Sequence, residues 1–308
     1  MAIDRPDQAS VLTLHEPASA MPPAGPLAAR LSRRERYAEL ARALMRSKTF
    51  VVGALILLFW ILDAMLWRVL ATDDPSAVDP TATLRGPSGA HFFGTDDLGR
   101  DVFSRVLAGA ESVLTVAPAA TALGIFGGVA VGLLTGYYRG LVDNVVMRVI
   151  DAALAFPLII IAVLVLAVLG RSTLNVVLVI GIVFTPLVSR TVRSAVLVER
   201  EREYVAAAKL RGESGLYIMV AEILPNITAP IAVEATIRLG YAIFTSATLS
   251  FLGLGLRPPS PDWGLAVASG RAFLQIAPWI VLFPALALAT LVIAVNLVAD
   301  GLKQVVEE

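Results

Sequence analysis

Long stretches without a charged residue are the feature that most constrains the fold of this chain. Such stretches lie between Glu111 and Arg139, Asp151 and Arg171, Arg171 and Arg190, Arg238 and Arg257, and Arg271 and Asp300. A helix that crosses about 30 Å of hydrocarbon at about 1.5 Å per residue needs about 20 largely apolar residues. The chain is 57% apolar and only 16% charged, and its mean hydropathy is +0.76. Lipid is therefore the expected solvent for most of it.

A further apolar segment, at about residues 49–70, holds Asp63 as an interior charge and Trp60 and Trp67 as interface anchors. The sequence thus predicts an all-α polytopic membrane protein with six transmembrane helices in a domain of residues 49–308. The predicted spans are 49–70, 112–136, 149–170, 174–192, 227–250 and 276–299. The two sizeable loops on one side are residues 71–111 and 251–275, and the main loop on the other side is residues 193–226.

The orientation follows from the placement of Lys and Arg, which are in excess in cytoplasmic loops. Seven basic residues lie within residues 30–48, directly before the first span: Arg30, Arg33, Arg34, Arg36, Arg42, Arg46 and Lys48. A cytoplasmic start followed by six crossings places both termini in the cytoplasm. Residues 1–48 are then a cytoplasmic tail, and their proline-rich beginning is typical of disorder. A cleaved signal peptide is the rival interpretation of residues 30–70, but the apolar stretch is long for one.

Several classes of site are disfavoured by composition. The chain has no Cys and two His, His15 and His91, so we expect no disulfide, no metal site and no catalytic residues. It contains no GxxxxGK[ST] phosphate loop and therefore no apparent nucleotide site of its own. We also expect no nucleic-acid partner, because the net charge is zero.

The loop of residues 193–226 contains the polar segment EYVAAAKLRGESGLYIMVAEILPN, which begins at Glu203. Alanines favour a short helix, Gly212 permits a turn, and Pro225 disfavours helix at Leu224 and marks the start of the next span. The segment resembles the Glu-Ala-Ala signature of the cytoplasmic loop of binding-protein-dependent ABC import permeases. The matching residues are Ala207, Ala208, Gly212, Leu224 and Pro225.

Ala206 replaces the first Glu of that signature, and its Ile before Leu-Pro is displaced. Loss of the Glu is common in the peptide-importer branch, where Glu-Tyr-Val, here Glu203, Tyr204 and Val205, stands three residues earlier. Residues 91–114 and 250–264 resemble segments of the C-type subunit of dipeptide and oligopeptide permeases. The resemblance covers the chain from about residue 91 to its end.

The resemblance implies the type I ABC importer permease fold and a position in the cytoplasmic membrane of a bacterium. It implies a heterodimer with a B-type permease, two ATPase subunits that use ATP and Mg, and an external substrate-binding protein. Residues 203–216 would be the coupling helix that docks on an ATPase. Its small residues Ala207, Ala208 and Gly212 would seat in a groove, and Glu203, Lys209 and Arg211 would set its register. This chain would itself be neither an enzyme nor a binder of a cofactor.

Two features inside the spans add to this interpretation. Glu234 and Arg238 are four residues apart, so on one helix they neutralise each other, with a role in the pathway as the alternative. Gly124, Gly128 and Gly132 recur every four residues and predict a close helix contact, within the chain or across the dimer.

Other functions remain open at this stage. Cargo other than peptides, such as nickel complexes, is carried by near relatives of the family. A sodium- or proton-coupled secondary transporter would need an ion site and usually internal symmetry, and neither is clear in the sequence. A membrane anchor would not explain the ordered Ala-Ala-Gly-Leu-Pro loop.

Overall fold

A computed structural model describes residues 42–307, and these residues form helices and turns without a β-strand. Of the predicted tail of residues 1–48, residues 1–41 lie outside the described range, as does His15. The chain divides into two units, residues 1–42 and 43–308, and the helices described lie in the second. The prediction of an all-α protein is confirmed for the described part.

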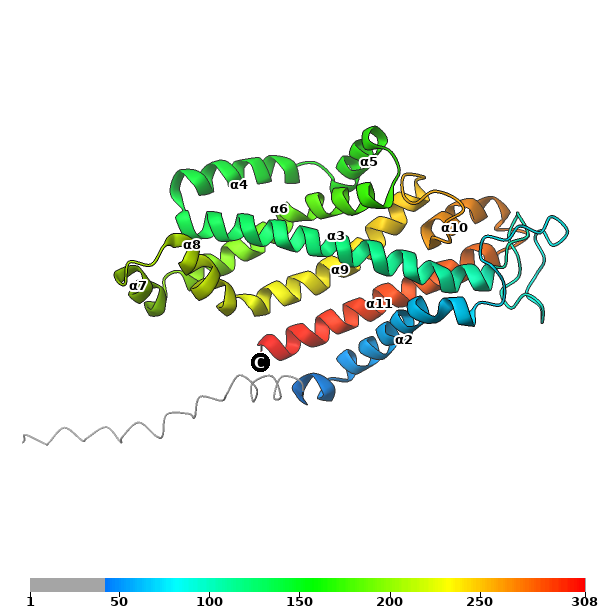
Figure 1. Ribbon diagram of the computed structural model, residues 1–308, viewed down its shortest axis with the longest axis horizontal. Helices are drawn as coiled ribbons and strands as arrows, with labels where there is room; N and C mark the ends of the chain where they lie inside the picture. The colour runs from blue at the N-terminus through cyan, green and yellow to red at the C-terminus, as the bar shows by residue number, and fades with distance from the viewer. Residues whose placement is uncertain (1–41, 308) are drawn as a thin grey trace, which may run out of the picture. The chain divides into compact units, whose positions relative to one another are not determined.

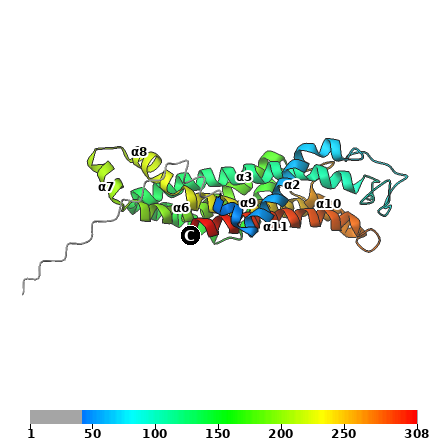
Figure 2. The same cartoon turned by 90° about the horizontal axis from the view of Figure 1, so that it is seen from below.

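The elements follow one another in this order along the chain. They are α2 (Lys48–Leu70), α3 (Val102–Tyr138), α4 (Gly140–Leu154), α5 (Leu158–Leu169), α6 (Thr173–Glu199), α7 (Glu203–Leu210), α8 (Gly215–Tyr217), a π-helix η1 (Ile218–Ile223), a 3-10 turn η2 (Leu224–Asn226), α9 (Thr228–Phe251), α10 (Trp263–Gly270), a second 3-10 turn η3 (Arg271–Phe273) and α11 (Trp279–Glu307). In Figures 1 and 2, α7 and α8 lie at one end of the bundle and α10 at the other.

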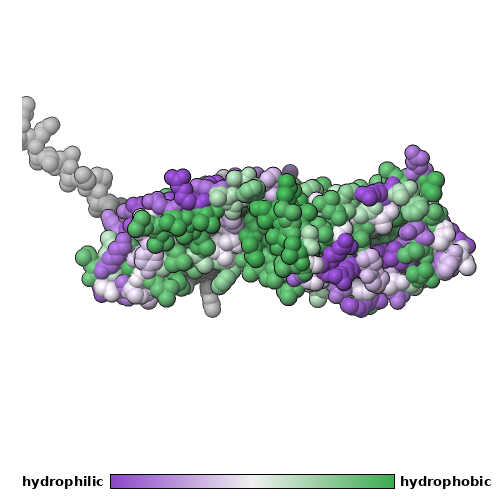
Figure 3. All heavy atoms as spheres, turned by 90° about the horizontal axis from the view of Figure 1, so that it is seen from above, coloured by the Kyte–Doolittle hydropathy of each residue, from purple (hydrophilic) through white to green (hydrophobic). Residues whose placement is uncertain are grey.

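Four described helices, α2, α3, α6 and α11, are long and apolar enough to cross a membrane. Two bent pairs bring the number of spans to six if each pair is one span: α4 with α5, and residues 215–226 with α9. Hydrophobic residues cover the middle of the face drawn in Figure 3, and polar residues gather towards both ends. That distribution suits a bundle whose middle lies in hydrocarbon.

The predicted span at residues 149–170 is not one continuous helix, because the chain breaks there into α4 and α5. The two helices meet at 85°. Pro157 causes the break, since it lacks an amide hydrogen and disfavours helix at Phe156. Helix α4 is held to α6 by Arg193, whose Nε and Nη2 donate to the Asp143 carboxylate at 2.5 and 2.6 Å. Arg190 adds a second bridge to Asp151.

Helices α3, α6 and α11 are longer than the sequence predicts, and α11 continues to Glu307. Helix α3 begins at Val102 rather than near 112, so the end of the predicted loop 71–111 is helical. The Asp101 side chain caps it by accepting a hydrogen bond from the Ser104 amide at 2.7 Å. Helix α6 continues to Glu199, which moves the start of the predicted loop 193–226 to a later residue. Polar residues extend α3 and α6 beyond the apolar runs from which the spans are predicted.

The glycines of α3 pack directly on α6. A Cβ atom added at Gly128 would lie 2.4 Å from the Val188 Cβ atom, and one added at Gly132 would lie 2.7 Å from the Val192 Cβ atom. An added Cβ atom would lie 3.0 Å from the Phe184 Cβ atom at Gly124 and 2.7 Å from the Val196 Cβ atom at Gly136. The predicted close contact is therefore within the chain. The contact runs in the same direction along both helices, because successive glycines meet successive residues of α6.

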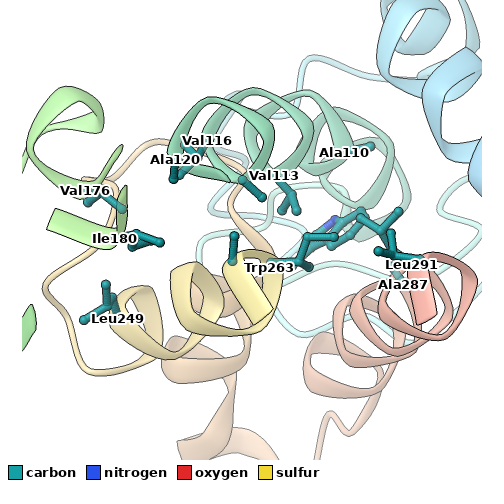
Figure 4. Close-up of a cluster of buried hydrophobic side chains, with 14 of the residues drawn as sticks. Ala110, Val113, Val116, Ala120, Val176, Ile180, Leu249, Trp263, Ala287 and Leu291 are labelled. Atoms are coloured by element: carbon teal, nitrogen blue, oxygen red, sulfur yellow. The ribbon is translucent and has the colours of Figure 1, made fainter. Parts of the chain in front are cut away.

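Trp263 of α10 lies at the centre of the main apolar core. Its indole is fully buried, and Nε1 donates to the Val106 carbonyl of α3 at 2.8 Å. Figure 4 shows Trp263 between side chains of α3 and α11, with α6 and α9 completing the cluster. An indole needs a partner for its N–H when it is buried, and the α3 carbonyl supplies it. The tryptophan thereby fixes α10 against the spans.

Arg105 joins the two loops at the α10 end of the bundle. It is buried and lies one turn into α3, where Nη1 donates to the Pro75 carbonyl at 2.8 Å and Nη2 to the Ser260 carbonyl at 3.1 Å. Its Nε lies 3.8 Å from Asp96, which also binds Arg100. The segments that precede α3 and α10 are thus held to the same helix.

We predict that Gly128→Ala destabilises the protein. The added methyl group has no space beside Val188, and overpacking costs about 1–3 kcal/mol, which exceeds the gain in helix propensity of about 1 kcal/mol. The measurement is the midpoint of thermal unfolding of the purified protein in detergent. Gly240→Ala is the matched control, because its Cβ would meet no atom closer than 3.2 Å. An equal effect of both substitutions would contradict the close-contact interpretation.

Candidate functional site

Helix α7 is fixed to the ends of the long helices by an apolar cluster of its own. Val205 and Ala208 of α7 are fully buried there. The other buried members come from α3, α6, η1 and the residue that caps α9: Leu133, Val188, Val192, Val196, Ile218, Met219, Ile223 and Ile227. Ile231 of α9 packs against them. Residues three apart share one face of a helix. The cluster therefore holds α7 by the face that carries Val205 and Ala208.

The prediction that Ala207, Ala208 and Gly212 form one face for a partner is wrong for Ala208. Ala208 is buried in the chain's own cluster, whereas Ala207 and Gly212 are exposed. Helical geometry separates the two alanines, because neighbouring residues point about 100° apart. Only Ala207 and Gly212 of the three remain available to a partner.

Gly212 ends α7 by adopting a left-handed conformation. Its φ is +78°, its amide donates to the Lys209 carbonyl at 3.0 Å, and the Glu213 amide donates to the Ala208 carbonyl at 3.2 Å. Glycine takes this conformation without a steric penalty. A Cβ at Gly212 would meet nothing within 4 Å. The backbone conformation, and not a close contact within the chain, is the structural reason for glycine.

Two of the three charged residues predicted to set the register of docking have partners inside the chain. Arg211 Nη2 donates to Glu222 Oε1 at 3.0 Å, and Lys209 Nζ lies 5.7 Å from the centre of the Tyr137 ring. Glu203 lies in the first turn of α7 and is exposed. A carboxylate there suits the positive end of the helix dipole. The positive charges thus also stabilise the fold of the loop.

Tyr204 connects α7 to the end of α6. Its hydroxyl donates to Glu199 Oε1 at 2.9 Å. Burial, together with this hydrogen bond to a carboxylate, raises the pKa of Tyr204 to about 12. The hydroxyl therefore keeps its proton at neutral pH and remains a donor.

Leu224 and Pro225 form the turn from the loop into α9. Leu224 packs on the α7 cluster, and Pro225 is exposed in η2. The segment of residues 215–226 meets α9 at 72°. Glu222 and Asn226 support the turn, since the Asn226 side chain donates to the Glu222 carbonyl at 2.7 Å. Helix α9 begins three residues after Pro225, at Thr228.

The loop that contains Gly212 carries exposed apolar residues that the sequence interpretation missed. Leu210 is 90% exposed, Leu216 67% and Val220 51%. We call Leu210, Leu216 and Val220 the loop apolar surface. A polar loop with large exposed apolar side chains is typical of a protein interface. The signal was present in the sequence as apolar residues within a loop that lies outside the spans.

Glu234 and Arg238 form an ion pair on α9. Arg238 Nε donates to Glu234 Oε1 at 2.6 Å, and Thr191 of α6 donates to the second carboxylate oxygen at 3.3 Å. Glu234 is buried. Mutual neutralisation explains how two charges are accommodated inside a span. The alternative role in a transport pathway stays a prediction.

Among the described residues, one group of three side chains has the spacing of metal ligands: Asp73, His91 and Asp101. His91 Nδ1 lies 3.0 Å from Asp101 Oδ1 and 3.9 Å from Asp73 Oδ2. The other Asp101 oxygen caps α3. A hydrogen bond between His91 and the capping carboxylate accounts for the group. The expectation of no metal site stays a prediction.

Comparison with known proteins decides the family. The family of the binding-protein-dependent transport system inner membrane component matches residues 128–308. This chain belongs to that family. The match covers the α7 cluster, the loop apolar surface and the turn at Pro225. It confirms the resemblance and the type I importer fold inferred from the sequence. The family member described here is therefore a multi-pass inner-membrane component of a transport system that depends on a binding protein.

Curated relatives align with most of the chain. The dipeptide transport system permease protein DppC of Alkalihalophilus pseudofirmus is 40% identical over 271 residues, which are 88% of this chain and 89% of the relative. The glutathione transport system permease protein GsiD of Pectobacterium atrosepticum is 37% identical, covering 89% and 91%. The di/tripeptide transport system permease protein DppC of Pseudomonas aeruginosa is 35% identical, covering 87% and 91%.

We predict that Ala208→Leu lowers stability and Ala207→Leu does not. The leucine at 208 would be forced into a filled cluster, at a cost of about 1–3 kcal/mol, whereas an exposed substitution stays within about 0.5 kcal/mol. The measurement is thermal unfolding of the two purified variants. A larger loss for Ala207→Leu would contradict the orientation of α7 described above.

Proposed function

We propose that this chain is one of two permease subunits of an ATP-driven importer of dipeptides or oligopeptides. Peptide cargo is supported by the names of the relatives, which include dipeptide, di/tripeptide and glutathione systems. The partners we propose are a B-type permease, two ATPase subunits that use ATP and Mg, and an external substrate-binding protein. Both termini lie in the cytoplasm in this proposal, in agreement with the basic residues before α2.

The attachment of α7 to the spans is the observation that carries the proposal. The α7 cluster contains residues of α3, α6 and the start of α9, so a displacement of α7 moves the ends of three spans. Packed interiors transmit such displacements because their compressibility is low. An ATPase that changes shape against α7 would thus act on the membrane pathway. The loop apolar surface, Ala207 and Gly212 are where it would dock.

We predict that Leu210→Gln weakens docking of the ATPase. Burying a leucine contributes about 1.5–3 kcal/mol, so the affinity should fall roughly tenfold or more. The measurement is the dissociation constant of the purified ATPase subunit for the permease pair in nanodiscs. Leu141→Gln on α4 is the matched control, because Leu141 is 82% exposed but lies outside the loop. Unchanged affinity for Leu210→Gln would remove Leu210 from the interface.

We predict that Gly212→Arg uncouples ATP hydrolysis from transport. Arginine adds bulk at the exposed end of α7, where the partner would sit. Gly212→Ala is the control. Both variants place a side chain at a positive φ, which costs about 1–2 kcal/mol, but only arginine adds a large side chain. The measurement is peptide uptake per ATP hydrolysed in proteoliposomes that contain the complete system. Normal coupling in Gly212→Arg would overturn the docking proposal.

A further inference from the structure

A polar cleft lies at the α10 end of the described bundle, away from α7. Its volume is about 530 Å³. It is bounded by the outer part of α3, the residues that begin α6, and the loop before α10. The charged and polar residues that line it include Glu111, Ser112, Thr115, Arg171, Arg257 and Ser260. Cavities of about 300–1,000 Å³ are typical of small-molecule sites.

Positive charge gathers on one side of the cleft. Arg171 and Arg257 are both exposed, and neither side chain has an ion-pair or hydrogen-bond partner among residues 42–307. Ser172 caps α6 directly after Arg171 by accepting from the Asn175 amide at 3.1 Å. The N-terminus of this long helix adds partial positive charge. Two unpaired guanidinium groups beside a helix N-terminus favour a carboxylate ligand.

A negative charge, that of Glu111, lies on the α3 side of the cleft. Glu111 Oε2 accepts a hydrogen bond from Trp67 Nε1 at 2.6 Å, which fixes the carboxylate. Arg68 lies 3.6 Å from the same oxygen, but 67% of its side chain is exposed, and such an ion pair is weak. No contact to Oε1 occurs within the described part of the chain. That oxygen is available to a cationic group.

Short peptides match this arrangement of charges. A peptide with free termini carries an ammonium group at one end and a carboxylate at the other, and each extended residue spans about 3.3–3.6 Å. We propose that the cleft binds short peptides by their termini during passage, with the carboxylate at Arg171 and Arg257 and the ammonium group at Glu111. The inference rests on the proposed function, because it takes peptides as cargo and this end as external.

The absence of Cys from the chain allows a direct test. Ser112→Cys places a single thiol in the cleft, and Ser76→Cys places one on the exposed outer segment as the matched control. The assembled transporter in nanodiscs is treated with a maleimide, without binding protein or nucleotide. Labelling of each thiol is followed by mass spectrometry of this chain, with dialanine or N-acetyl-dialanine-amide present.

The expected result is protection of Ser112→Cys by dialanine alone. At about ten times the half-saturating concentration the labelling rate should fall roughly tenfold, because about nine tenths of the sites are occupied. The capped peptide should not protect, and Ser76→Cys should be unaffected by either. Arg171→Gln and Arg257→Gln, each combined with Ser112→Cys, should reduce the protection by dialanine.

Several outcomes would overturn the inference. Equal protection by the capped peptide would show that the termini are not recognised, and the absence of protection would show that the cleft does not bind peptides. Protection by the peptide-free binding protein, without protection by dialanine, would assign the cleft to protein docking. Peptide uptake by the complete system is measured on the same preparation. Uptake without protection would reject the cleft alone, whereas no uptake by the unmodified protein would reject the proposed function.

Discussion

The close contact between α3 and α6 is the interaction on which the rest of the structure depends. Glycines at four-residue intervals bring the α3 backbone against the valines of α6. The interiors of lipid-embedded bundles gain little from hydrophobic transfer, so close van der Waals packing has to hold the helices together. Because the two helices run in the same direction, their beginnings meet at one end of the bundle and their ends at the other. One proposed site lies at each end of the contact between α3 and α6.

At the α7 end, the packing of α3 on α6 brings apolar side chains of both helices together. Leu133 of α3 and Val188, Val192 and Val196 of α6 receive Val205 and Ala208 from α7. Arg200 strengthens the same end by donating to the carbonyls of Gly136 and Tyr137, which end α3. The last carbonyl groups of a helix lack an amide partner within the helix, and a positively charged side chain can donate hydrogen bonds to them. The loop is consequently a part of the bundle, although its composition is that of a soluble segment.

The sequence predicts the helical class, the six apolar runs and the place of the loop, because each depends on residue type and spacing. It does not predict the 85° bend at Pro157, because a proline inside an apolar run is compatible with a kink or a break. It also misassigns Ala208, since an alanine has no polarity that would distinguish a buried face from an exposed one. The role of Arg105 depends on contacts with two loops, and that of Glu111 on contacts with α2. Spacing alone carries no information on such distant contacts.

The two ends of the bundle differ in how their charged residues are paired, and this difference bears on transport. At the α7 end, the arginines of α6 are bound by carboxylates of α4, and Arg211 is bound by Glu222. Paired charges hold the helices of that end together, and Leu210, Leu216 and Val220 are exposed beside them. In the cleft at the other end, Arg171 and Arg257 lack such partners within residues 42–307. Two unpaired arginines and one free oxygen of Glu111 in an open cleft attract a zwitterion without holding it tightly, because solvent screens each contact. Weak retention is what a passage site needs, since cargo that binds tightly would not move on.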